Sequence, residues 1–527
     1  MEQRYIAAID LGTSKIALAI ARLSGENVEV IYYSETPSDG IYYSVVRNPK
    51  KASFKVRDAI LKAEDELKIK IRQVVLGLPR YSVAQEVAEG TLGRTDPNEY
   101  INFEEVEMLK EIALQSYPLE DEKSQIIYGA VAQSFSTDDE FQLSESDVVG
   151  TLSSKVVGNF KIFIGNRSSV VSIDKMFNDL GIAIAKKYFL PDVTAKAVLS
   201  AEEKENGVAL VDFGHGVTSV TIYSNGIMRH YYAIPFGGSN VTRDIRIECA
   251  ISPDLAESIK LAYGACQPTK LVTLSEKTLQ IRYEDGPFKE IPVKFISSII
   301  DAREREIIDA ILYSIQESNL KDELRSGIVI TGGGANMANL SNLIKEMSGY
   351  NVRIGYPKHR FSSEGVTGAY ETGAASVIGM ILAARDDRLP TCLNAPATVP
   401  MPWESTYSPV EQPYSPYEAP APVAPPTWEP TPLPEPEPVA EEKQEPLPQP
   451  EPLRQEEPVH ETVSVRETET IREPEPLRKP KPRPDNRKPG WGKVIWQKLT
   501  KVSSNVAEGV ERAVDKFYTS VTEEVNE

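Results

Sequence analysis

Two short segments of this sequence combine residue types that suit the binding of phosphate and a metal ion. The first runs from Asp10 to Lys15 (DLGTSK) and the second from Asp212 to Thr218 (DFGHGVT), each directly after an apolar run. Glycine lets backbone N–H groups approach an anion, and a concave set of such groups binds it. A carboxylate repels phosphate, so we expect Asp10 and Asp212 to act through Mg²⁺ or its water molecules. Further donors in the first segment are Thr13, Ser14 and Lys15.

Both segments belong to a longer internal repeat. Residues 6–12 (IAAIDLG) and residues 208–214 (VALVDFG) match position by position at an offset of 202 residues. Repetition at the scale of a domain predicts two duplicated halves that face each other. Asp–Gly turns are common for purely structural reasons, but their repetition in equivalent places favours a shared ligand-binding role.

A third segment, with Gly332, Gly333 and Gly334 in a row, follows the apolar run IVIT. Adjacent glycines let the backbone come close to a flat purine ring or a phosphate. By itself such a segment is also an ordinary loop between a strand and a helix. The three segments together predict a nucleotide site in which the two hairpins clamp a triphosphate between the halves.

The elements around these segments indicate an α/β architecture. Each aspartate lies between two β-rich runs, which predicts a β-hairpin in each half. Apolar residues at helical spacing predict amphipathic helices at 54–68, 102–117 and 169–182. The alternation of strands and helices implies a largely parallel sheet in each half.

Composition excludes several classes of protein. The chain has 527 residues and a formal net charge of −19, which argues against a general nucleic-acid binder because neutralising phosphates requires Lys and Arg. Its three cysteines are too few and too scattered for a disulfide framework or a Cys-x-x-Cys metal site. We recognise no signal peptide and no apolar run of about 18 residues, so we expect a cytoplasmic protein without a spanning helix.

The C-terminal part of the chain has a different composition. Of the 39 prolines, 27 lie between Pro390 and Pro489, interspersed with glutamates. Such a segment cannot bury a core, so residues 389–489 are predicted to be a disordered linker.

Residues 490–527 have apolar residues at steps of three and four, which predicts an amphipathic helix. Its first part is basic and carries two tryptophans, which is typical of a helix that lies on an anionic membrane surface. The residues expected at the membrane are Trp491, Lys493, Ile495, Trp496, Lys498, Leu499, Lys501 and Val502. The later part turns acidic, so a coiled-coil partner helix is the alternative.

The order of these elements resembles that of the actin, Hsp70 and sugar-kinase superfamily. Within it, the chain most resembles the FtsA family of bacterial cell-division proteins, in the segments IAAIDLGTSK, PDVTAKAVLSAEEKENG, GVALVDFGHGVTSVTIYSNGIMRHYYAIPFGGSNVTRDI, AESIKLAYG and GIVITGGGANMANL. The resemblance covers residues 4–385. It implies two actin-like (ribonuclease-H-like) α/β domains around a nucleotide cleft, each with an inserted subdomain, plus a disordered C-terminal tail ending in an amphipathic helix.

The resemblance also sets the expected domain boundaries. They are 1–80 and 161–195 for the first domain, 81–160 for its insert, 196–240 and 313–388 for the second domain, 241–312 for its insert, 389–489 for the linker and 490–527 for the membrane-targeting helix.

For the site, the resemblance implies ATP with Mg²⁺. It assigns phosphate contacts to both hairpins, including Gly12, an adenosine loop to Gly332–Gly334, and ribose or base contacts to Glu257 and Lys260; as an alternative, these two charges are simply solvated on a helix. The family's second loop usually reads Asp-x-Gly-Gly-Gly-Thr, whereas here it contains Gly214, His215, Gly216 and Val217, and Thr218 would supply the hydroxyl after a shift of one residue. No catalytic residue is identifiable, so we expect at most a slow ATPase.

By resemblance, the protein is expected to polymerise and to tether the tubulin-like protein FtsZ to the cytoplasmic face of the inner membrane at the division site, among other divisome proteins. A small-molecule kinase of the same superfamily or a pilus-assembly actin homologue are the alternatives. An Hsp70-like chaperone is disfavoured because a proline-rich tail replaces its folded peptide-binding domain.

Overall fold

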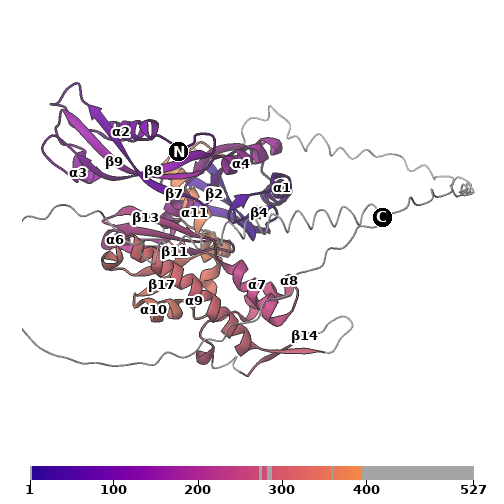
Figure 1. Ribbon diagram of the computed structural model, residues 1–527. Helices are drawn as coiled ribbons and strands as arrows, with labels where there is room; N and C mark the ends of the chain where they lie inside the picture. The colour runs from indigo at the N-terminus through magenta and orange to yellow at the C-terminus, as the bar shows by residue number, and fades with distance from the viewer. Residues whose placement is uncertain (1–2, 272–275, 282–287, 359, 394–527) are drawn as a thin grey trace, which may run out of the picture. The chain divides into compact units, whose positions relative to one another are not determined.

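The computed structural model describes residues 3–271, 276–281, 288–358 and 360–393 (Figure 1). All of them belong to one compact unit, Met1–Pro416. The predicted linker beyond residue 393 and the predicted membrane helix lie outside the described residues.

The first half is built on a five-stranded sheet with the order β10-β6-β1-β2-β3. Consecutive residues of β1 and β2 are fully buried, so both faces of this sheet are covered. The strands are β1 (Arg4–Leu11), β2 (Lys15–Ser24), β3 (Asn27–Pro37), β6 (Gln73–Gly77) and β10 (Ala183–Tyr188). The helices that pack on it are α1 (Pro49–Leu67), α4 (Arg167–Leu180), α5 (Leu190–Val198) and α11 (Ala375–Asp386).

The second half repeats this sheet strand for strand, with the order β13-β12-β11-β16-β17. Its strands are β11 (Val208–Phe213), β12 (Thr218–Ser224), β13 (Ile227–Ile234), β16 (Ile328–Thr331) and β17 (Val352–Ile354). Helices α6 (Ala201–Asn206) and α10 (Leu340–Ser348) flank it. The equivalent orders confirm the duplication predicted from the repeat.

The prediction of largely parallel sheets was wrong in one respect. The first three strands of each half pair antiparallel, and only the last two pairings of each sheet are parallel. Strands joined by a short turn must run antiparallel, whereas a parallel pairing needs a long crossover. In the first half that crossover contains α1, together with the short strands β4 (Ile41–Tyr42) and β5 (Val45–Val46).

Each half carries an insert. The first has its own core and a three-stranded sheet of order β7-β9-β8, with β7 (Ala84–Gly93), β8 (Gln125–Ser136), β9 (Lys155–Asn166), α2 (Phe103–Ser116) and α3 (Glu145–Val148). The second consists of α7 (Gly238–Cys249), α8 (Pro253–Tyr263), α9 (Val293–Glu317) and a hairpin of β14 (Thr278–Ile281) with β15 (Lys289–Pro292).

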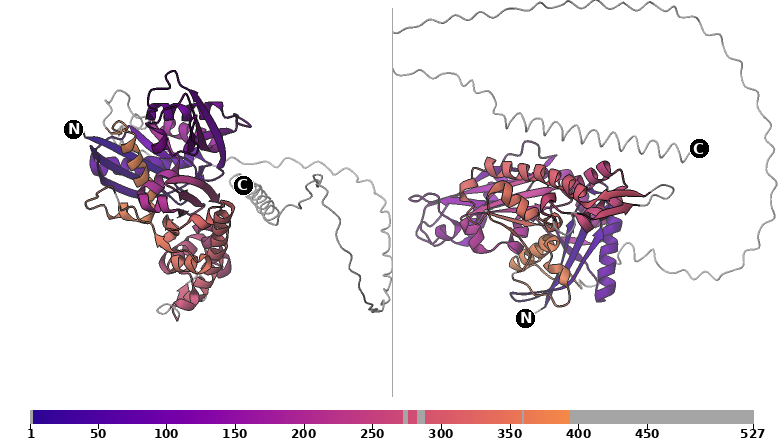
Figure 2. Two further views of the ribbon diagram at one scale, coloured as in Figure 1. Left: turned by 90° about the vertical axis from the view of Figure 1, so that its left-hand side faces the viewer. Right: turned by 90° about the horizontal axis from the view of Figure 1, so that it is seen from below.

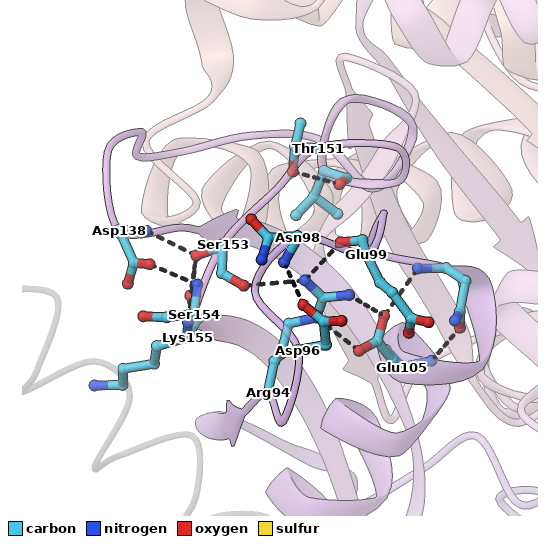
Figure 3. Close-up of polar contacts among 12 residues, drawn as sticks. Arg94, Asp96, Asn98, Glu99, Glu105, Asp138, Thr151, Ser153, Ser154 and Lys155 are labelled. Atoms are coloured by element: carbon cyan, nitrogen blue, oxygen red, sulfur yellow. Dashed lines mark hydrogen bonds and ion pairs between the residues drawn. The ribbon is translucent and has the colours of Figure 1, made fainter.

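A buried arginine holds the outer part of the first insert together (Figure 3). The side chain of Arg94 is 3% exposed and donates from Nε to Glu105 Oε1 at 2.7 Å. It also donates to the backbone oxygens of Glu99 at 2.9 Å and Ser153 at 3.0 Å. Glu105 in turn accepts from the backbone of Asn102 in the capping box that begins α2. The side chain of Arg94 thus joins three segments of the insert.

The chain returns to the first half after β17. Helix α11 is buried along almost its whole length and packs against β1, β2, β6 and α5, and Figures 1 and 2 show this orange helix beside the indigo strands. The backbone N–H of Cys392 donates to Tyr5 O at 2.6 Å, and that of Arg72 donates to Cys392 O at 3.1 Å. The resemblance places residues 313–388 in the second half, but α11 packs against the sheet of the first.

Candidate functional site

The two predicted hairpins have the same turn. Leu11 pairs with Ile16, and Phe213 pairs with Thr218, which leaves four residues between the paired positions in both cases. A Cβ atom at Gly12 would lie 2.6 Å from Lys15 O, and one at Gly214 would lie 2.5 Å from Val217 O. Both turns therefore require glycine directly after the aspartate-bearing strand.

The two turns lie against each other. A Cβ atom at Gly216 would lie 2.9 Å from Thr13 Oγ1 and 3.1 Å from its Cγ2, so the side chain of Thr13 contacts the opposite turn. Thr13 Oγ1 also accepts from the backbone N–H of Ser44 at 3.1 Å. The repeat therefore brings the two glycine turns face to face, as the hypothesis of a shared site requires.

Arg80 lies between the two aspartates. Its Nη2 is 2.9 Å from Asp10 Oδ2, and its Nη1 is 2.9 Å from Asp212 Oδ2. The three side chains are 11%, 16% and 9% exposed, respectively. One guanidinium thus bridges a carboxylate from each half of the molecule, in the charge-assisted geometry that makes such hydrogen bonds strong.

Burial and charge act in opposite directions at this junction. Burial alone would lower the pKa of Arg80, but Asp212 and Asp10 outweigh it and raise that pKa. Burial raises the pKa of Asp212, and Arg80 opposes that rise. The positive charge of Arg80 therefore offsets the cost of burying the two carboxylates.

Arg80 has two further partners. Nη2 donates to Ser376 Oγ in α11 at 2.6 Å, and the hydroxyl of Tyr231 in β13 donates to the backbone oxygen of Arg80. No motif marks Arg80 in the sequence, where it is a lone arginine after the segment GLP. The one feature that could have pointed to Arg80 is its position, as a basic residue just after a buried strand that lies next to β1.

The donor set at this junction suits a hard cation, because carboxylate oxygens from both halves face one guanidinium group. That guanidinium belongs to Arg80, so Asp10 and Asp212 can take Mg²⁺, directly or through water, only if Arg80 moves. Among the described residues there is no group of three or more His, Cys, Asp or Glu side chains that could hold a metal ion.

Two of the three glycines pack against Asp212 and Phe213 at the end of β11. Gly332 has a positive φ of 84°, and a Cβ atom there would lie 2.3 Å from Asp212 Oδ1. A Cβ atom at Gly334 would lie 2.9 Å from Phe213 Cβ, whereas one at Gly333 meets nothing within 4 Å. The first and third glycines are thus required for packing against β11, and Gly333 faces open space beside it.

Glu257 and Lys260 lie beside the second turn. The Nζ of Lys260 donates to Glu257 Oε2 at 2.7 Å, Thr242 Oγ1 at 3.0 Å and Gly238 O at 3.1 Å. The Gly238 N–H in turn donates to Gly214 O at 3.1 Å. The two predicted ribose or base contacts are therefore joined to the second turn through the first residues of α7.

His215 faces the same group of charges. Burial and the nearby positive charge of Lys260 lower its pKa, and Glu257 opposes them. A Cβ atom at Gly238 would lie 3.6 Å from His215 Nδ1, which places the ring against the start of α7. A neutral imidazole is thus favoured at the position where the family usually has glycine.

The remaining predicted site residues differ in their exposure to solvent. Ser14 is exposed, whereas Thr218 is fully buried and its Oγ1 has no hydrogen-bond partner. Lys15 is paired with Glu35, which also accepts from the hydroxyl of Tyr33. The first turn therefore presents a hydroxyl and an amino group, and the second presents the half-buried imidazole of His215.

The fold defines the class of protein. It is similar to the "PilM-PilN type IV pilus biogenesis complex", with a TM-score of 0.53 and 14% sequence identity, covering 72% of this chain and 98% of that chain. With two equivalent sheets meeting at paired aspartate turns, this is an actin-like fold.

Sequence comparison gives the family. The family model of cell division protein FtsA matches residues 209–379. Cell division protein FtsA of Borreliella burgdorferi is 29% identical over 360 residues, covering 68% of this chain and 86% of that protein. The protein of the same description from Neisseria meningitidis is 27% identical over 361 residues, covering 68% and 85%, and that of Bacillus subtilis is 24% identical over 355 residues, covering 67% and 78%. Over about two thirds of its length, the chain is thus similar to the FtsA family of cell-division proteins.

Proposed function

We propose that this protein is an ATP-binding, actin-like cell-division protein whose nucleotide site is formed by the two hairpin turns and the three-glycine segment. The observation that carries the proposal is the contact between the two turns, each beside an aspartate, with Gly332 and Gly334 packed against the end of β11. The similarity to the FtsA family supports it.

Each part of this site has a task in the proposal. Backbone N–H groups of the two glycine turns bind the phosphates, with Ser14 and Lys15 as side-chain donors from the first turn. Asp10 and Asp212 hold Mg²⁺, which would neutralise phosphate charge, and the open space at Gly333 accepts the adenosine. Glu257 and Lys260 are expected at the ribose or base.

Nucleotide binding can be tested at Gly333 without disturbing the fold. A side chain at Gly333 meets nothing within 4 Å, so Gly333→Val is expected to fold normally and to lower ATP affinity by roughly tenfold or more, as a misplaced group in a binding pocket does. The measurement is calorimetric titration of the full-length protein with ATP and Mg²⁺, with thermal unfolding alongside.

The matched control is Gly93→Val, because Gly93 also has open space around its Cβ position and lies in the first insert. Equal ATP affinity in Gly333→Val, Gly93→Val and the wild type would show that the glycine segment is not the adenosine site.

Attachment to a membrane is the second part of the proposal. The protein would form filaments and tether FtsZ, with other divisome proteins, to the inner membrane at the division site through residues 490–527. The supporting observation is the basic, Trp-bearing amphipathic pattern of that segment. In the part of the chain that the structure describes, every helix is too short or too polar to cross a membrane.

Vesicle co-sedimentation tests the tether. Trp496→Glu removes a ring expected at the headgroup level and adds a negative charge near an anionic surface, so binding to vesicles rich in phosphatidylserine should be lost. Trp428→Glu, in the proline-rich segment, is the control and should sediment like the wild type. If Trp496→Glu sediments with vesicles as well as the control does, the segment binds a partner protein instead.

A further inference from the structure

The junction of Asp10, Arg80 and Asp212 is arranged as a closed ion cluster. Each aspartate uses its Oδ2 atom for the arginine, at 2.9 Å in both cases. Two negative charges and one positive charge leave the cluster with a net charge of −1, directly beside turns proposed to bind phosphate. A triphosphate alone would be repelled by this cluster, so nucleotide binding here requires a change in its charge.

The position of Arg80 is imposed by both halves of the molecule. Its backbone oxygen accepts from Tyr231 of the second half, and its Nη2 donates to Ser376 in α11. Its Nε is buried without a hydrogen-bond partner. The side chain is thus held from several directions, and one of its donors is left unsatisfied, which is a cost that a chain normally avoids.

We propose that Arg80 is an internal cation that competes with a divalent metal ion for Asp10 and Asp212, so that loading of the metal–nucleotide complex displaces the arginine and exchanges its link between the two halves for one made by the metal. This inference rests on the proposed function, since that function brings Mg²⁺ to the same two carboxylates.

Competition follows from the geometry of the two cations. Mg²⁺ requires oxygen ligands in a compact octahedral shell and usually keeps several waters, so it cannot share the space between the two Oδ2 atoms with a guanidinium. Replacing Arg80, which carries one positive charge, by Mg²⁺, which carries two, changes the net charge of the cluster from −1 to zero. That change removes the repulsion of the triphosphate, and it frees Arg80 to face the phosphates.

The exchange is coupled to the arrangement of the halves. Arg80 follows β6 of the first half, and Asp212 belongs to β11 of the second. An ion that removes the arginine from Asp212 therefore removes a direct ion pair between the halves.

Metal binding without nucleotide tests this directly. The full-length protein is titrated with Mn²⁺ in the absence of nucleotide, and free Mn²⁺ is measured by electron paramagnetic resonance. Arg80→Gln is expected to bind Mn²⁺ on the order of tenfold more tightly than the wild type, because a competing unit charge has been removed from a partly buried site. Arg80→Lys keeps a charge but cannot bridge two carboxylates, so its affinity should lie in between.

Arg94→Gln is the matched control. The side chain of Arg94 is also buried and is paired with a carboxylate, Glu105, but within the first insert. It should lose stability as Arg80→Gln does and bind Mn²⁺ like the wild type. If Arg80→Gln does not fold, Arg80→Lys still decides the comparison.

Two results would overturn the inference. The first is that neither Arg80 variant binds Mn²⁺ more tightly than the wild type. The second is that the wild type binds ATP equally well in Mg²⁺ and in EDTA while Arg80→Gln loses ATP, since Arg80 would then be a phosphate ligand in place of the metal. Absence of ATP binding in every variant would instead contradict the proposed function, and the Mn²⁺ titration would still test the competition.

Discussion

The turn between β1 and β2 and the turn between β11 and β12 occupy equivalent places in the two sheets, but their side chains differ. At an offset of 202 residues, Thr13 corresponds to His215 and Lys15 to Val217. The first turn has an exposed serine and a lysine paired with Glu35, whereas Gly216 and Val217 of the second are buried. The two turns therefore share a backbone arrangement but carry different side chains.

The two turns share one requirement, for glycine, and differ in another, for side-chain donors. The glycine after the aspartate-bearing strand is needed by the backbone in both halves. The hydroxyl and amino groups are present in the first turn only, and the second is instead joined to α7 through Gly238 and Ser239. The first turn is therefore the source of side-chain donors, and the second is the rigid side of the site.

The largest expected effect comes from the aspartates. Asp212→Asn should lower the free energy of unfolding by about 3 kcal/mol, because it leaves a buried guanidinium short of a partner. Asp10→Asn should cost about 2 kcal/mol, since Asp10 is the more exposed of the two. Urea unfolding measures both. A gain in stability from either substitution would mean that repulsion between the two carboxylates outweighs their pairing with Arg80.

Substituting the glycine of either turn should lower the stability by a similar amount, because the two turns have the same backbone arrangement. Gly12→Ala and Gly214→Ala each place a methyl group within 2.6 Å of a backbone oxygen. We expect each to lower the free energy of unfolding by about 2 kcal/mol, a typical penalty for overpacking. Thermal and urea unfolding of the pair would check this. A large effect at one glycine and none at the other would show that the turns are not equivalent.

His215 should give the second turn a pH dependence that the first lacks. Burial, with the charge of Lys260, lowers the pKa of His215 in the folded state, so the unfolded chain binds its proton at the higher pH. Stability is therefore lost as the pH falls through about 6.5. His215→Gln should flatten the curve of unfolding free energy against pH below that value. An unchanged slope would show that the imidazole is already solvated.

The smallest effect concerns the contact between the turns. Gly216→Ala brings a methyl group to 2.9 Å from Thr13 Oγ1, at the end of a side chain that can move. We expect a loss below about 1 kcal/mol, and we expect Thr13→Ala to remove most of it, giving a coupling of about 0.5 kcal/mol in a double-mutant cycle. Strict additivity would show that the turns do not touch in solution.

Local patterns in the sequence were sufficient for the elements and for the repeat. The spacing of apolar residues predicted the helices that became α1, α2 and α4, and the match between residues 6–12 and 208–214 predicted the two equivalent hairpins. These features depend on neighbours a few residues apart, which periodicity records.

The features that the sequence did not predict depend on distant contacts. Arg80 meets Asp212 and Ser376 only because three separate segments converge, and no local pattern marks that convergence. The return of α11 to the first half has the same origin, because an apolar helix can be buried equally well in either core. The roles proposed for Gly333, Glu257 and Lys260 stay predictions until nucleotide binding is measured.

The hydrogen bonds of Cys392 also determine how the molecule would carry a mechanical load. Residues 391–393 are tied to the beginning of β1 and to Arg72 just before β6. Tension applied to the chain beyond residue 393 would therefore enter through the first-half sheet, as shear along β1. That strand ends beside Asp10, so the load path of the tail and the ion cluster at Arg80 share one strand. A pull on the C-terminal segment would therefore strain the strand that carries Asp10.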